Sequence, residues 1–253
     1  MAIQGDLGLY LSGMPVPVDQ CNIIIKPPKI KEIVMTIGED DFLMIMQILG
    51  HTELFVKEIK EGNPELNLLS DFQVLLVILQ EEKTIKSLSE RFFSLIFPEY
   101  DINITENSIE FRLKESGMLV SVINPFTFPY LQQTLKELFE PQNTTEEEFN
   151  PIDDKAKEIA EKLRKGREKR NKLKAGKDDS KMKSLFAVQT SVLSIGLGIN
   201  INVFFDYTPF QLYDAFMRYT SKLASDFYRR VSSMPFMDTS QMEAPPEWTR
   251  GLY

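Results

Sequence analysis

The chain has 253 residues, 43% of them hydrophobic and 26% charged, a composition ordinary for a globular protein with a sizeable core. Its only cysteine, Cys21, excludes an intramolecular disulfide and is typical of a protein in a reducing cytosol. The net charge of −8 is unevenly distributed: residues 155–183 hold 13 Lys and Arg against 5 Asp and Glu, whereas the remainder holds 16 against 32. A basic element therefore interrupts an acidic protein.

The first 50 residues are expected to start as an extended arm and to continue into a helix. Residues 1–20 contain no signal-peptide pattern, and their glycines and prolines leave no room for a helix. Residues 21–25 predict an edge strand or an extended contact, because this β-branched run ends at two prolines. Residues 30–37 fit either a short helix or a strand. Three acidic residues from Glu39 onward then predict the first turn of a core helix that reaches Leu49.

The next stretch combines helical periodicity with a hairpin. Apolar spacings of three and four predict helices over residues 53–61, 72–79, 84–97 and 129–139, with Asp71 as the cap of the second. Between them the period changes to two, which predicts a hairpin turning at Glu106 and Asn107 and a third strand over 118–123. The first 140 residues are therefore expected to form one mainly helical α+β domain with a small antiparallel hairpin.

Two polar segments follow this domain. Residues 141–151 are predicted to be a linker, because they are polar and have a proline at each end. Residues 152–183 predict a very basic connector helix. It could bind nucleic acid through phosphates, or it could be a solvated helix that docks against the acidic domain. The second reading is favoured, because no aromatic residue interleaves the charges and three glutamates would repel a phosphate backbone.

Residues 184–205 form a stretch of 22 residues without a charge, which is long enough to span a bilayer. However, polar residues and glycines interrupt it from Gln189 to Asn202, and such groups are costly in hydrocarbon. A buried helix followed by a turn is therefore predicted here, with no membrane association.

The last predicted helix covers residues 208–231. Thr208 suits the N-cap, Pro209 the first helical position and Gln211 the capping box. Beyond the cap, residues recur at spacings of three and four and form one mostly apolar stripe: Tyr213, Phe216, Met217, Thr220, Leu223, Ala224, Phe227 and Val231. The C-terminal part, residues 184–253, is therefore predicted to be helical with an aromatic tail.

Such a stripe is more often core than interface, but the tail behind it carries further aromatic rings without periodicity. Large rings of this kind either pack back or dock elsewhere, and they dominate interface energetics. The residues predicted to bind a partner are Tyr213, Phe216, Met217, Phe227, Phe236, Trp248 and Tyr253.

No catalytic constellation is found in the sequence. His51 is the only histidine and follows Gly50 at a predicted helix end, where a C-terminal cap is the ordinary reading. Adjacent carboxylates such as Asp40 and Asp41 point to different faces of a helix and make poor acid–base pairs. Gly196-Leu197-Gly198 lacks the lysine of a phosphate loop. We therefore expect a non-enzymatic protein with no cofactor and no metal.

Four segments together resemble small proteins of tailed bacteriophages and prophages. They are IIIKPPKIKEIVMTIGEDDF (residues 23–42), NPIDDKAKEIAEKLRKGREK (150–169), VLSIGLGI (192–199) and the end of the chain, YTPFQLYDAFMRYTSKLASDFYRR with PPEWTRGLY. The similar proteins are encoded beside the tail tube and tape-measure genes and are regarded as tail assembly chaperones. Their helical C-terminal part starts with Thr-Pro or Met-Thr, here Thr208-Pro209, followed by Tyr213 and Asp214.

This resemblance implies a non-enzymatic factor of phage tail morphogenesis in the host cytoplasm. Such a factor shields hydrophobic helical segments of a tape-measure or baseplate protein during assembly. One alternative is a minor structural component of the tail or baseplate, which would have the same chemistry but stay in the virion. Another is a regulator that binds nucleic acid through the basic helix.

Overall fold

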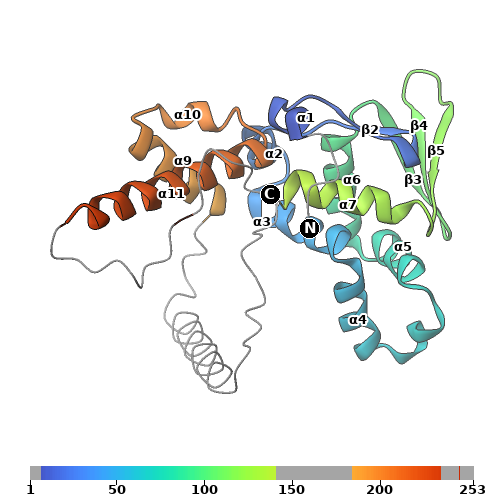
Figure 1. Ribbon diagram of the computed structural model, residues 1–253. Coiled ribbons are helices and arrows are strands. Elements are labelled where there is room, and N and C mark those ends of the chain that lie inside the picture. Colours follow the sequence, from blue (N-terminus) through green and yellow to red (C-terminus); the bar gives the residue numbers. More distant parts are fainter. Residues whose placement is uncertain (1–6, 141–183, 235–244, 246–253) are drawn as a thin grey trace, which may run out of the picture.

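The computed structural model describes residues 7–140, 184–234 and 245, and these form an α+β structure that is mostly helical, as predicted. The three-stranded sheet lies at one end of the molecule and the C-terminal helices lie at the other, with α3 (Glu39–Gly50) and α7 (Phe128–Phe139) between them (Figure 1). The predicted linker and basic connector lie outside the described residues, so both stay predictions.

The described part of the chain begins with a short helix, α1 (Leu7–Ser12), where the sequence predicted an extended arm. That prediction was wrong because the burial of Tyr10 and the packing of neighbouring leucines on the core outweigh the low helix propensity of Gly8. The helix ends at Gly13, whose φ of 67° suits glycine. Strands β1 (Val16–Val18) and β2 (Ile23–Ile25) then pair antiparallel around the short helix η1 (Asp19–Cys21), which confirms a strand within 21–25.

The predicted helices of the first 140 residues are confirmed. The structure contains α2 (Ile30–Thr36), α3 (Glu39–Gly50), α4 (Thr52–Gly62), η2 (Pro64–Leu68), α5 (Asp71–Glu81), α6 (Lys83–Ile96) and α7 (Phe128–Phe139). Residues 30–37 fitted either a helix or a strand by sequence, and the structure shows that Ile30–Thr36 are helical. The cap of α5 is Ser70 rather than Asp71, because the Ser70 hydroxyl accepts the N–H of Gln73 and Gln73 bonds back in a capping box.

The predicted hairpin and its third strand are also confirmed, as β3 (Tyr100–Ile104), β4 (Ile109–Leu113) and β5 (Leu119–Ile123) in the order β3-β4-β5. Ile102 lies opposite Phe111, and Ile104 opposite Ile109. Phe111 and Ile123 are buried against the helices, so one face of the sheet completes the core. Cys21 is buried beside it, and burial raises the pKa of its thiol.

The C-terminal helices are α9 (Leu185–Leu197), α10 (Ile201–Phe204) and α11 (Pro209–Ser232). They share the core of the first 140 residues: the Phe186 ring lies 6.4 Å from that of Phe42, and Phe210 packs edge-on against Tyr10 at 5.5 Å. Each aromatic pair of this kind adds to the area it buries. One continuous set of buried residues therefore joins parts of the chain on both sides of the predicted linker.

Backbone hydrogen bonds tie these parts together at helix ends. The first N–H groups of α2, on Ile30 and Lys31, donate to the carbonyl oxygens of Tyr207 (2.8 Å) and Phe205 (3.0 Å). The Glu39 carboxylate in turn accepts the N–H of Phe186 at 3.0 Å and the Ser184 hydroxyl. The three backbone N–H groups, on Ile30, Lys31 and Phe186, are donors that a helix N-terminus leaves without a partner inside the helix. We call this set of contacts the capping seam.

An ion pair borders the capping seam. The Asp206 carboxylate lies 2.6 Å from the Lys31 ammonium and 3.5 Å from that of Lys29. The hydrogen bond and charge of Lys31 hold the pKa of the Asp206 carboxyl below its usual range and raise the pKa of Lys31. All three side chains are exposed, so the pair adds little stability and mainly favours this orientation of the two segments.

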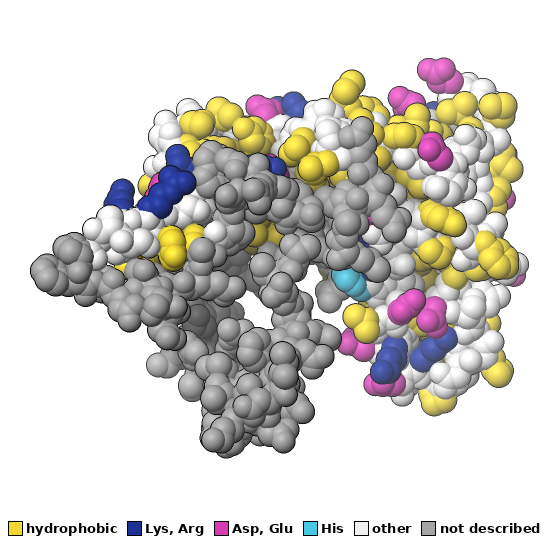
Figure 2. Space-filling view, viewed as in Figure 1, with side chains coloured by type: hydrophobic (Ala, Val, Ile, Leu, Met, Phe, Trp, Pro, Cys, Tyr) yellow, Lys and Arg dark blue, Asp and Glu magenta, His cyan; other side chains and the backbone are white. Residues whose placement is uncertain are grey.

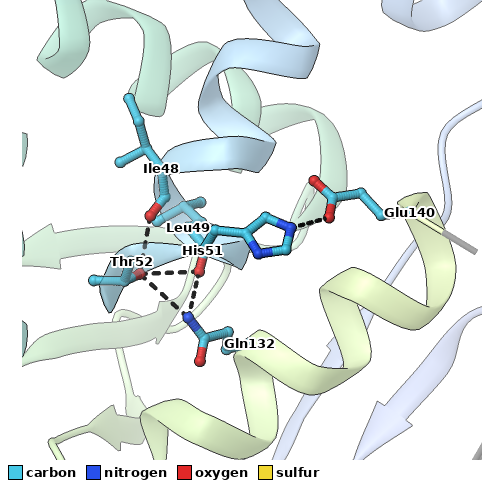
Figure 3. A network of polar contacts seen from close by, with 6 residues as sticks. All are labelled: Ile48, Leu49, His51, Thr52, Gln132 and Glu140. Atoms are coloured by element: carbon cyan, nitrogen blue, oxygen red, sulfur yellow. Dashed lines mark hydrogen bonds and ion pairs between the residues drawn. The ribbon is translucent and has the colours of Figure 1, made fainter. Parts of the chain in front are cut away.

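Polar contacts also attach the junction of α3 and α4 to α7 (Figure 3). Gln132 donates to the carbonyl oxygen of Leu49 at 3.0 Å and to the Thr52 hydroxyl at 3.3 Å. His51, the C-cap of α3 as predicted, lies with Nε2 2.7 Å from the Glu140 carboxylate. The single histidine therefore joins two helices at a point where the chain turns.

Candidate functional site

Helix α11 begins as the sequence predicted. Thr208 accepts the N–H of Gln211 at 3.3 Å, and Gln211 accepts the N–H of Thr208 at 2.9 Å, so the capping box is closed. Gln211 also donates to the carbonyl oxygen of Leu11 at 2.7 Å, which fixes the start of α11 against α1. The first turn is therefore held from both sides, and the rest of the helix extends away from the core (Figure 1).

The predicted stripe of α11 coincides only in part with its buried face, because Phe216 packs against the core and Val231 is buried, whereas Phe227 is exposed. The fully buried side chains near its start are Phe210 and Leu212, which the stripe did not include. Asp214 is also buried, and its carboxylate accepts two hydrogen bonds from Arg218 Nε, at 2.9 and 3.1 Å. In the second half of α11 the buried residues are Ser225 and Val231, and Val231 lies outside the main cluster of core residues.

The predicted partner-binding residues fall into three groups. Tyr213, Phe216 and Met217 are half-buried, Phe216 against the core, and burial raises the pKa of the Tyr213 hydroxyl. Phe227 is 61% exposed on the outer half of α11, where Leu223 is also exposed. The other predicted residues, Phe236, Trp248 and Tyr253, lie outside the described part of the chain. Their role in binding a partner stays a prediction.

Helix α9 meets α11 at a glycine. A Cβ atom placed on Gly196 would overlap the ring and hydroxyl oxygen of Tyr219. Glycine at this position lets the Tyr219 side chain lie directly against the backbone of α9. The crossing therefore depends on a residue without a side chain.

The uncharged segment is only half buried, contrary to the prediction of a buried helix. Phe186 and Leu193 of α9 and Phe204 of α10 face the core, together with the polar Gln189 and Thr190. The Thr190 hydroxyl is satisfied within the helix by the carbonyl oxygen of Phe186 at 2.7 Å. Gln189 and Thr190 are buried because they lie on the face of α9 that packs against the other helices. Apolar side chains of the segment therefore remain on the outer, exposed face.

These outer side chains form the α9–α10 apolar surface, which we define as Ile195, Leu197, Ile199, Ile201 and Val203. All five are exposed, Ile195 to 85%. Figure 2 shows hydrophobic side chains gathered over α10 at this end of the molecule. Patches of this kind commonly mark sites where other proteins bind.

The turn between α9 and α10 is fixed by its own hydrogen bonds. Gly198 has a φ of 67° and donates to the carbonyl oxygen of Ser194, whose hydroxyl in turn donates to the carbonyl oxygen of Ile199 at 2.7 Å. Asn200 caps α10 by accepting the N–H of Asn202 at 3.0 Å. The apolar side chains are therefore displayed by a defined backbone.

The α9–α10 apolar surface was missed by the sequence reasoning. A signal was present: IGLGININV (residues 195–203) alternates apolar residues with glycine and asparagine. Such alternation places all apolar side chains on one face of a strand. The chain adopts a helix, a turn and a second helix instead, and all five apolar side chains remain exposed.

The described residues offer little for other chemistry. Over 7–140 and 184–234, no group of three His, Cys, Asp or Glu side chains could hold a metal ion. None of the helices in these ranges is long and apolar enough to cross a membrane. A hollow of about 500 Å³ lies beside His51, and another of about 440 Å³ lies along β3.

In comparisons with known proteins, no family model, curated sequence or solved structure matches the chain.

Proposed function

We propose that the protein is a non-enzymatic factor of phage tail assembly, which shields hydrophobic helical segments of a tape-measure or baseplate protein. The observation that carries the proposal is the α9–α10 apolar surface, whose five side chains are exposed on a fixed backbone. The sequence segments that resemble tail assembly chaperones include part of this surface, residues 192–199. A partner helix would bury its apolar face on these side chains, and the net charge of −8 would keep the complex in solution.

The test is co-expression with the tape-measure protein encoded in the same phage or prophage. The double variant Ile195→Lys/Ile199→Lys places two charges on the surface without disturbing the core, because both side chains are exposed. We expect this variant to fold with an unchanged melting temperature and to leave the tape-measure protein in the insoluble fraction. The matched control is Leu68→Lys, at a position 94% exposed in η2, which should behave as the wild type.

A double variant that still keeps the tape-measure protein in solution would remove this surface from the mechanism. Mass spectrometry of purified particles separates the two phage functions: a chaperone is absent from the virion, whereas a minor tail or baseplate component is retained in it.

A further inference from the structure

Among the described residues, none pairs its backbone with the β3 edge of the three-stranded sheet, in contrast to the opposite edge. At β5, Asn22 Nδ2 donates to the carbonyl oxygen of Val120 at 3.3 Å, and the Ser121 hydroxyl donates to that of Cys21. These contacts from η1 and its C-cap cover the β5 edge. Natural proteins commonly cover sheet edges in this way, because an open edge is a template for another strand.

The register shows which backbone groups of β3 face outward. Thr105 N–H donates to the carbonyl oxygen of Ser108 at 2.8 Å, and Lys114 N–H donates to that of Glu99 at 3.1 Å. Hydrogen-bonded pairs alternate along an antiparallel ladder, so Asp101 and Asn103 direct their backbone groups towards β4. Ile102 and Ile104 must therefore direct their N–H and C=O groups away from β4, towards the open edge.

A hollow lies along this edge. It has a volume of about 440 Å³, and all five residues of β3 line it together with residues from the end of α5 and from α6. Its charged side chains balance: Lys86 and Lys114 are basic, and Glu90 and Asp101 are acidic. We call this hollow, with the outward backbone of β3, the β3 edge groove.

The β3 edge groove also contains a buried donor without a partner. Gln80, at the end of α5, lines it, and Gln80 Nε2 is the buried side-chain polar atom without a hydrogen bond in the described part of the chain. A buried amide that lacks a partner destabilises the protein unless something bound supplies an acceptor. The carbonyl oxygen of a peptide is such an acceptor.

We propose that the β3 edge groove binds an extended peptide segment of a partner protein, which adds to the sheet as a fourth strand beside β3. The peptide backbone would pair with the backbone of Ile102 and Ile104. One peptide carbonyl oxygen would accept a hydrogen bond from Gln80 Nε2. The balanced charges fit a segment that is uncharged at its centre, with apolar side chains towards Phe93 and polar ones towards Asn103. This site is separate from the α9–α10 apolar surface and extends beyond the proposed function.

The first test uses a displayed library of random 12-residue peptides, selected on the full chain, and a synthetic copy of the best binder. We expect N-methylation of the peptide amides that face β3 to weaken binding at least tenfold, because it removes the pairing N–H groups. Methylation of the intervening amides is the matched control and should change the affinity less than twofold. Equal effects of both patterns, or a selection that yields no binder, would overturn the proposal.

The second test uses variants of the protein. Ile102→Pro removes an outward N–H, whereas Ile102→Ala removes the side chain and keeps the N–H, so only the proline variant should lose the peptide. Gln80→Leu should weaken binding about tenfold and raise the melting temperature by about 2–4 °C, because the orphan donor is gone. A lower melting temperature for Gln80→Leu would show that the Gln80 amide already forms a hydrogen bond in the free protein. That result would refute the role of Gln80 as a donor to the peptide.

Hydrogen exchange of the free protein distinguishes other occupants. We expect the Ile102 and Ile104 amides to exchange fast in the free chain and slowly with the peptide. Slow exchange without the peptide would mean that the edge is already paired, within one chain if sedimentation shows a monomer, or with a second copy if it shows a dimer. Either result contradicts the proposal. The variant Ile195→Lys should bind the peptide normally, which keeps this test independent of the proposed function.

Discussion

Gly196 shows how much one residue can decide in this fold, because the Tyr219 side chain lies where a Cβ atom would be. We expect Gly196→Ala to destabilise the protein by about 1–3 kcal/mol, since the ring must move and the crossing of α9 and α11 must adjust. Urea denaturation measures this change. The matched control is Gly62→Ala, where no atom lies within 4 Å of the new Cβ and stability should stay equal or rise slightly. Equal stability of both variants would show that the crossing is loose.

At the residue scale, hydrogen bonds between residues close in the sequence were predictable, whereas the solvent exposure of single side chains was not. The capping box of Thr208 and Gln211 depends on residues three apart, and the structure confirms it. The exposure of Ile195 depends instead on which face of α9 the core covers. The local alternation of apolar residues over 195–203 marks a face of this kind, but the residues that cover the opposite face of α9 lie elsewhere in the chain. The partner-binding role predicted for the half-buried Tyr213, Phe216 and Met217 stays a prediction for the same reason.

At the scale of single elements, α11 is a helix with two unlike halves. Phe210 is fully buried near its start, whereas Phe227 is 61% exposed on its outer half. We expect Phe210→Ala to cost about 3–5 kcal/mol of unfolding free energy, because it leaves a cavity in the core. Phe227→Ala should change stability by no more than about 0.5 kcal/mol. Thermal or urea unfolding checks both, and similar losses would mean that the outer half is also packed.

The elements themselves were mostly predictable, because each follows from periodicity and caps within its own residues. The hairpin of β3 and β4 is an example: the period of two and the turn at Glu106 and Asn107 define it locally. The exceptions depend on distant residues. Helix α1 forms because Tyr10 packs against Phe210, two hundred positions later in the chain. The segment 195–203 alternates like a strand but is helical at both ends, held by α11 and the core.

At the scale of the whole molecule, the core joins residues from both sides of the predicted linker. Phe186, Phe204 and Phe210 are buried with Phe42 and Phe139. We therefore expect a fragment of residues 1–140 to unfold without a cooperative transition, because its core is left open on the side that faces α9–α11. Circular dichroism during heating measures this, with the full chain as the control. A fragment that melts cooperatively at the temperature of the full chain would show that residues 1–140 form an independent domain.

The capping seam has a consequence for synthesis of the chain. The first N–H groups of α2 cannot form their hydrogen bonds until Phe205 and Tyr207, which supply the carbonyl oxygens, have been synthesised. These residues leave the ribosome well over a hundred residues later. At translation rates of about 5–20 residues per second, that interval lasts roughly 10–30 s. During it the apolar residues that later meet α9 and α11, such as Phe42 and Tyr10, stay uncovered. The order of synthesis therefore leaves the core of the first 140 residues incomplete until α9–α11 have been made.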